Sequence, residues 1–134
     1  INLKVQLEII GLFYLCKHDV IIYTFMYRVY LISSGLDEKQ YKIGYTRRKV
    51  EERIKEFKTG NSNNLEIVSI FESKWGTKIE AYMHRLFKSK LINGEWFNLS
   101  NDDVKNFYYY CEKTHNNIEL MVNKNSYIID RRGL

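Results

Sequence analysis

The sequence predicts an α+β domain, in which a small three-stranded antiparallel sheet is flanked by about three helices. Three short runs are rich in β-branched and aromatic residues, which is typical of strands. Three longer runs carry apolar residues at the i, i+3, i+4 spacing of amphipathic helices. The predicted strands cover residues 29–32, 41–44 and 65–71, and the predicted helices cover 47–58, 77–90 and 101–113.

The first two strands are separated by the turn-rich run Ser33–Glu38, so we expect them to form a hairpin. Gly44 ends the second strand and predicts a tight exit from it. Thr46 then stands where a side chain caps the first helix. The apolar stripe of that helix runs from Val50 to Phe57.

The third strand and the second helix follow. Alternate residues from Leu65 to Phe71 are expected on one face of the strand. Thr77 opens the second helix. On that helix, Glu80 and His84 fall one turn apart beside the apolar stripe, where they can face a cleft while their neighbours face the core.

The chain divides into a central domain and two flanking segments. Residues 1–25 read as an N-terminal extension of uncertain status, residues 26–115 as the functional domain, and residues 116–134 as a tail or short strands. Ser100 and Asp103 have the capping-box spacing that opens the third helix. The N-terminal apolar run is shorter than the ~18–20 residues that span a bilayer, and it lacks a basic start and a cleavage site. We therefore expect an intracellular protein, in cytoplasm or nucleus, that is neither secreted nor transmembrane.

Positive charge is concentrated in one window. From Lys39 to Lys58 there are eight basic and three acidic residues, a net +5 that equals the formal charge of the whole chain. Such a surplus suits a polyanionic partner, or it forms a solvated helix face with Glu–Lys pairs. The two cysteines supply neither a disulfide framework nor a metal quartet.

Five motifs in order resemble the core of the GIY-YIG nuclease superfamily. They are Val29–Tyr30–Leu31, then Lys42–Ile43–Gly44 beginning eleven positions after Leu31, then Arg53, then Glu80–Ala81–Tyr82–Met83–His84, and finally Gly94–Glu95–Trp96–Phe97. This combination is similar to the small, often stand-alone branch found in phage and viral proteins and in the fungal meiotically up-regulated type. Lys42 stands where the second triplet usually has tyrosine, which leaves the identity of the general base open.

The resemblance implies roles for five side chains. Tyr30 positions or deprotonates the attacking water, and it needs nearby cations such as Lys42 and Arg53 to favour its phenolate. Arg53 binds the phosphate, because a guanidinium can donate hydrogen bonds to two phosphate oxygens at once. Glu80 holds the metal ion, and His84 bonds the water or a phosphate.

Each of these side chains also has a structural alternative. Tyr30 can be a core tyrosine and Lys42 a solvated strand lysine. Arg53 can pair with Glu52 or Glu56, and a lone histidine such as His84 is often structural. Glu80 has the capping-box spacing from Thr77, so it can cap its own helix.

Further residues complete the expected site. Gly44 and Asn98 support it, the latter because it resembles a late asparagine of the family. Glu95 and Trp96 are expected to pack and orient the chain. The expected nucleic-acid-binding residues are Lys42, Arg47, Arg48, Lys49 and Arg53.

The resemblance implies a metal-dependent endonuclease that uses one Mg²⁺ or Mn²⁺ ion and leaves 5′-phosphate and 3′-hydroxyl ends. DNA is the expected partner, RNA stays open, and no membrane is involved. One such site cuts one strand, so a double-strand break requires a transient homodimer or two visits. The alternatives are a catalytically inactive nucleic-acid-binding domain of the same fold and a protein-interaction domain.

Overall fold

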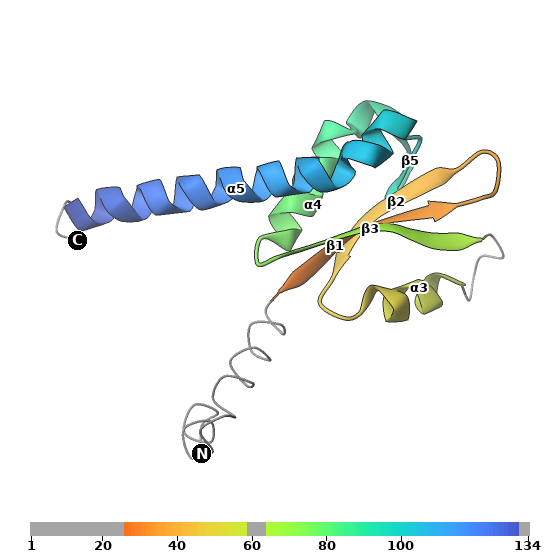
Figure 1. The fold of residues 1–134 in the computed structure, drawn as a ribbon, viewed down its shortest axis with the longest axis horizontal. Helices are drawn as coiled ribbons and strands as arrows, with labels where there is room; N and C mark the ends of the chain where they lie inside the picture. The colour runs from red at the N-terminus through yellow and green to blue at the C-terminus, as the bar shows by residue number, and fades with distance from the viewer. Residues whose placement is uncertain (1–25, 59–63, 132–134) are drawn as a thin grey trace, which may run out of the picture.

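The computed structural model describes residues 26–58 and 64–131, which form five strands and three α-helices (Figure 1). In chain order the elements are β1 (Tyr27–Ser34), β2 (Gln40–Thr46), α3 (Val50–Lys58), β3 (Leu65–Ser73), α4 (Gly76–Leu86), a 3₁₀ turn η1 (Lys88–Lys90), β4 (Leu91–Asn93), β5 (Trp96–Phe97) and α5 (Asn101–Arg131). The expected N-terminal extension, residues 1–25, lies outside the described residues.

The α+β class is confirmed, but the sheet has five strands instead of three. Its order is β3-β1-β2-β5-β4, and all neighbouring strands are antiparallel. β4 and β5 are three and two residues long, too short to carry a recognisable period. Within β2, only Tyr41 and Lys42 pair with β5, so no described strand covers the same edge of β2 from Ile43 onward.

A separate core covers each face of the sheet. Figure 1 shows α3 on one side, and α4 with the first part of α5 on the other. Val29 and Leu31 of β1 belong to the core under α4 and α5, whereas Tyr30 and Ile32 belong to the core under α3. Strand β1 is therefore buried on both faces, which explains why it reads as an unbroken apolar run.

A bulge in β3 overturns the expected alternation along that strand. Leu31 pairs with Ser69 but Ile32 pairs with Ile67, so Val68 is the extra residue. As a result Leu65 packs in the core under α3, and Phe71 packs in the core under α4 and α5. The two residues do not share a face.

The helix starts are partly as expected. α3 begins at Val50, because Thr46 Oγ1 accepts the Arg48 N–H at 3.0 Å and forms a turn before the helix instead of a cap. α4 begins at Gly76 and ends at Leu86, and only the short 3₁₀ turn η1 follows before Leu91. The capping box of α5 is confirmed by a hydrogen bond of 2.9 Å from Ser100 N–H to the Asp103 carboxylate, and one of 3.1 Å from Asp103 N–H to Ser100 Oγ.

α5 is far longer than expected. It runs without a break from Asn101 to Arg131, so an end near residue 113 and short strands after residue 116 are both wrong. Ile118 still packs against the core under α4 and α5, but the C-terminal part of the helix extends past the sheet (Figure 1). With no sheet beneath it, that part carries only a weak apolar pattern. Among residues 26–58 and 64–131, none of the helices has the length and hydrophobicity of a membrane-spanning segment.

Candidate active site

Tyr30 lies at the centre of β1, with its phenol directed across β2. Its side chain is only 1% exposed. Tyr30 is paired with Gly44, and a Cβ added at Gly44 would come within 2.4 Å of the Tyr30 hydroxyl oxygen. Gly44 is therefore required for this close approach and not for a tight exit, because it lies within β2 and the strand continues to Thr46.

Arg53 reaches the Tyr30 hydroxyl from α3. Its guanidinium donates a hydrogen bond to that oxygen and also pairs with the Glu56 carboxylate one turn later. It lies over the Phe57 ring at 4.8 Å from the ring centre. The expected pairing with Glu56 and the expected proximity to Tyr30 are therefore both present.

Lys42 and Glu95 form an ion pair beside this group, with 3.0 Å between Lys42 Nζ and Glu95 Oε2. Lys42 Nζ lies 4.5 Å from the Phe57 ring centre and 5.7 Å from that of Trp96. Lys42 is thus not a solvated strand lysine, since its side chain is 14% exposed. Two rings and a carboxylate hold its ammonium in place.

Glu80 and His84 approach the same edge of the sheet from α4. His84 Nε2 lies 2.7 Å from Glu80 Oε1 and 2.9 Å from the Ile43 carbonyl oxygen. Both neighbours accept hydrogen bonds while Glu80 is ionised, so Nε2 carries the proton. α4 has no side-chain cap, so the capping role for Glu80 with Thr77 is absent. His84 instead ties Glu80 to the backbone of β2.

The open edge of β2 is where groups from both faces of the sheet meet. A cavity of about 330 Å³ lies there, lined by Tyr30, Tyr45, Thr46, Arg48, Arg53 and Glu95. Glu80 does not line this cavity, but its charge acts on Tyr30, and the charge of Glu95 acts on both. Tyrosine, arginine and two carboxylates are therefore close enough to interact.

The electrostatics of Tyr30 differ from expectation. Burial raises the pKa of its phenol to about 12, and the negative charge of Glu95 adds to the rise. The hydrogen bond from Arg53 lowers this pKa but does not outweigh burial. Arg53 thus favours the phenolate as expected, but Lys42 is not among the groups that shift this pKa, and burial dominates, so Tyr30 is a neutral hydrogen-bonding group at pH 7.

The surroundings of the Glu80 carboxylate suit a bound cation. Burial raises its pKa, the neighbouring His84 lowers it, and the charge of Glu95 raises it further. A divalent ion would offset the repulsion between the two carboxylates. In the part of the chain that the structure describes, no three His, Cys, Asp or Glu side chains form a metal cluster. The carboxylate oxygens of Glu80 and Glu95 are hard ligands of the kind that suits Mg²⁺, an ion that keeps several waters and takes few protein ligands.

The expected nucleic-acid-binding residues are mostly engaged within the protein. Arg48 shares Glu56 with Arg53, and Arg47 donates a hydrogen bond to the Tyr27 hydroxyl at 2.5 Å. Lys49 alone among the five has no side-chain partner in the described residues. Arg48 and Arg53 line the cavity, but Arg47 and Lys49 do not.

Asn98 and Glu95 lie in other surroundings than expected. Asn98 lines a different cavity, together with Glu38, Lys39 and Gln40 at the start of β2, so it is not brought to the site. Glu95 was expected only to pack, yet it lines the cavity beside Tyr30 and Arg53. In the sequence, the only hint that Glu95 belongs to the site is its position next to Trp96. Trp96 pairs with Lys42, and this pairing appears only in the folded sheet.

The fold and the cavity together define a class: a small α+β domain with a tyrosine–arginine–carboxylate site at an open sheet edge. The chain belongs to the T5orf172 domain family, whose model matches residues 27–112, from β1 into α5. Comparisons with curated proteins and with solved structures found no match.

Proposed function

We propose that this protein is a metal-dependent endonuclease of the GIY-YIG type, which hydrolyses DNA phosphodiester bonds to 5′-phosphate and 3′-hydroxyl ends. The observation that carries the proposal is the hydrogen bond between Arg53 and Tyr30 at a cavity that also contains Glu95 and lies within electrostatic range of Glu80. Membership of the T5orf172 family, together with the five ordered motifs, supports it.

The side chains suit in-line attack on a phosphate. Arg53 binds two non-bridging oxygens and stabilises the negative charge that develops on them. Tyr30 orients the attacking water through its neutral phenol, because its raised pKa prevents it from taking a proton at pH 7. Lys42 adds positive charge, and Glu95 holds it in place.

Glu80 would hold one Mg²⁺ or Mn²⁺ ion, and His84 fixes the orientation of its carboxylate. When bound, such an ion offsets phosphoryl charge and makes water more acidic, which fits a tyrosine that only positions water. The remaining ligands would come from water and from the nucleic acid.

A second candidate is a nucleic-acid-binding domain of the same fold that does not cut. The raised pKa of Tyr30 and the Lys42–Glu95 ion pair favour it, since both reduce the basicity and the free charge at the site. This candidate predicts binding that persists without any cleavage.

Nicking of supercoiled plasmid separates the two candidates. With Mg²⁺ or Mn²⁺ we expect cleavage that EDTA abolishes and that Glu80→Gln and Arg53→Ala each reduce by about 100-fold or more. The matched controls are Glu66→Gln and Lys55→Ala, which change exposed residues of β3 and α3 and should leave cleavage unchanged. Binding without cleavage by the parent protein contradicts the nuclease.

The same assay addresses substrate and stoichiometry. Single-stranded RNA of matched sequence tests whether the site accepts a 2′-hydroxyl. Nicked circles that precede linear product would agree with one strand cut per visit, whereas linear product from the outset would agree with a homodimer.

A further inference from the structure

Tyr45 places an exposed aromatic ring at the rim of the candidate active site. The residue is 43% exposed, yet it lines the same cavity as Tyr30 and Arg53. The other exposed tyrosines in the described part of the chain do not line this cavity; they are Tyr82, Tyr108 and Tyr109. Tyr45 is therefore the exposed ring that a ligand at the Arg53 site would meet.

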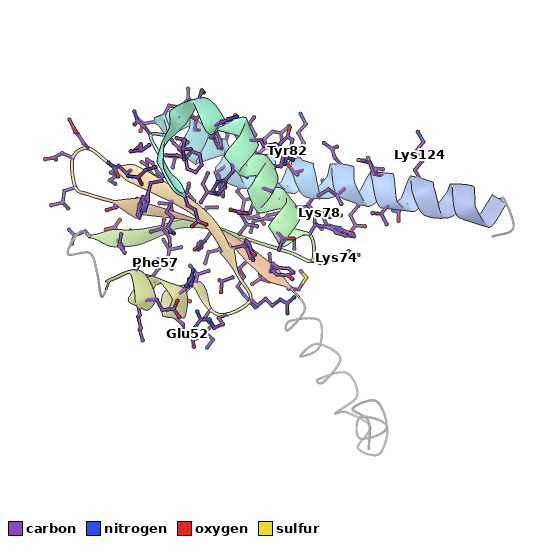
Figure 2. All side chains as sticks on the ribbon, turned by 180° about the vertical axis from the view of Figure 1, so that it is seen from behind. Glu52, Phe57, Lys74, Lys78, Tyr82 and Lys124 are labelled. Carbon is purple, nitrogen blue, oxygen red and sulfur yellow. The ribbon has the colours of Figure 1, made fainter. Side chains whose placement is uncertain are left out.

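Tyr45 faces the opposite side of the sheet from Tyr30. Partners across a hairpin share a face of the sheet. Tyr30 belongs to the core under α3, whereas Tyr45 pairs with Val29, which belongs to the core under α4 and α5. Figure 2 shows Phe57 of α3 and Tyr82 of α4 on opposite sides of the sheet. The cavity at the open edge of β2 is thus lined from both faces.

The first turns of α4 run beside Tyr45. α4 begins against the side chain of Tyr27, whose ring meets the Tyr45 ring edge to face with the ring centres 5.7 Å apart. About two turns later, His84 is hydrogen-bonded to the carbonyl oxygen of Ile43, which lies two residues before Tyr45 and about 7 Å away along β2. Glu80 lies between these two points of α4. Tyr45 therefore stands between the cavity on one face and the helix that carries Glu80 on the other.

The Tyr45 ring is held in place and has a free face. An edge-to-face contact with Tyr27 occupies at most one face of the Tyr45 ring, and no cation or second ring of the described residues lies over it. Tyr27 is itself fixed, because the Arg47 guanidinium lies 4.7 Å from its ring centre and donates a hydrogen bond of 2.5 Å to its hydroxyl. The buried Arg28 donates in turn to the Arg47 carbonyl oxygen. These contacts order the ring before a ligand arrives, which reduces the entropy lost on binding.

We propose that Tyr45 stacks on an unpaired nucleobase beside the scissile phosphate, so that the substrate is DNA with at least one unpaired nucleotide at the cut. The inference rests on the proposed function and narrows its substrate class. A base inside a duplex is stacked on both sides, whereas an unpaired base offers a free face. Because every base has such a face, Tyr45 selects the structure of the strand and not its sequence.

The test compares two single strands in their binding to the Glu80→Gln protein, which keeps the cavity and should not cut. One strand is a short oligothymidylate, and the other is an abasic oligomer of the same length and charge. Each competes with a fluorescent strand, and anisotropy measures the affinity. We expect the bases to raise the affinity about tenfold, an effect typical of one base–aromatic stack.

Added to this protein, Tyr45→Ala should remove the difference between the two strands, and Tyr45→Phe should keep it. The matched control is Tyr109→Ala, which removes an exposed ring from α5 and should also keep the difference. Circular dichroism checks that all the proteins are folded. In a second measurement, the parent protein with Mg²⁺ should cut a duplex that carries a short unpaired bulge faster than the same duplex fully paired.

Equal affinity for the two oligomers overturns the inference without any change at Tyr45. A base effect that persists in folded Tyr45→Ala protein overturns it too, as do equal cutting rates on the two duplexes. These results leave the proposed function standing, because the strand is still bound or cut. Failure of the Glu80→Gln protein to bind any DNA at low salt overturns the proposed function as well.

Discussion

Gly44 of β2 lies directly beneath the hydroxyl of Tyr30, with no space for even one additional carbon between them. The two residues are paired across the β1–β2 hairpin, so both are fixed by the hydrogen bonds of the sheet. This contact directs the phenol towards the open edge of β2, where Arg53 meets it.

Gly44→Ala should therefore displace the Tyr30 ring. We expect a loss of about 1–3 kcal/mol in the free energy of unfolding, as for other overpacked sites, and a loss of any nicking activity. Urea denaturation measures the first effect. In the double variant with Tyr30→Ala, the two stability losses should be less than additive because the clash is gone. Strict additivity would show that Gly44 and Tyr30 do not clash.

Ionisation of the Tyr30 phenol should reduce the free energy of unfolding in alkaline solution. Its pKa is about 12 in the folded protein against an ordinary value near 10, so folding favours the neutral form. The contribution of the neutral phenol to the free energy of unfolding is fully present below about pH 10 and is lost as the pH rises towards about 12. Urea denaturation over this range should show the loss in the parent and not in Tyr30→Phe. The same pH dependence in both proteins would contradict the assignment.

Glu95 should add to the rise in the pKa of Glu80 that burial produces. Because the negative charge of Glu95 helps to raise the pKa of Glu80, Glu95→Gln should lower that pKa in metal-free protein. Carbon-13 NMR of labelled glutamate carboxyls measures it, with Glu80→Gln to assign the signal. Glu66→Gln, on exposed β3, is the control that should leave the signal unchanged. An unchanged pKa in Glu95→Gln would mean that the two carboxylates do not interact.

A second polar network should hold α5 on the sheet. Ser73 Oγ accepts the Trp75 N–H at 2.9 Å and lies 2.7 Å from His115 Nδ1, while Glu119 accepts a hydrogen bond of 2.9 Å from the Trp75 ring. Serine, histidine and glutamate here resemble a nucleophile with its base, but Ser73 is completely buried and its Oγ already accepts the Trp75 N–H.

Ser73→Ala leaves the Trp75 backbone N–H and a histidine nitrogen without their partner. We expect it to reduce the free energy of unfolding by about 1–3 kcal/mol in urea denaturation. The control Ser89→Ala removes a hydroxyl from an exposed position in η1 and should have little effect. A loss of equal size in both would mean that the Ser73 network does not stabilise the docking of α5.

Most of the helices and strands, and the chemical types of the site residues, follow from local patterns in the chain. Local periodicity is enough to locate the β1–β2 hairpin, the stripes of α3 and α4 and the capping box of α5, because each depends on neighbours within a few residues. The order of Tyr30, Arg53 and Glu80 along the chain likewise follows from the motifs. β4 and β5 are too short to show a period, and apolar residues of α5 beyond Ile118, such as Leu120 and Met121, are exposed and form no core-facing stripe, so these parts of the structure were missed.

The groups that these side chains contact are known only from the folded chain. Whether Arg48 and Arg53 are free to bind phosphate depends on Glu56, and whether Lys42 is solvated depends on Glu95 and two rings. The pKa of Tyr30 is set chiefly by burial, which no local pattern reports. The burial of a side chain and its charge partners depend on residues that are distant in the sequence. The fold brings those residues together from opposite faces of the sheet, at the open edge of β2.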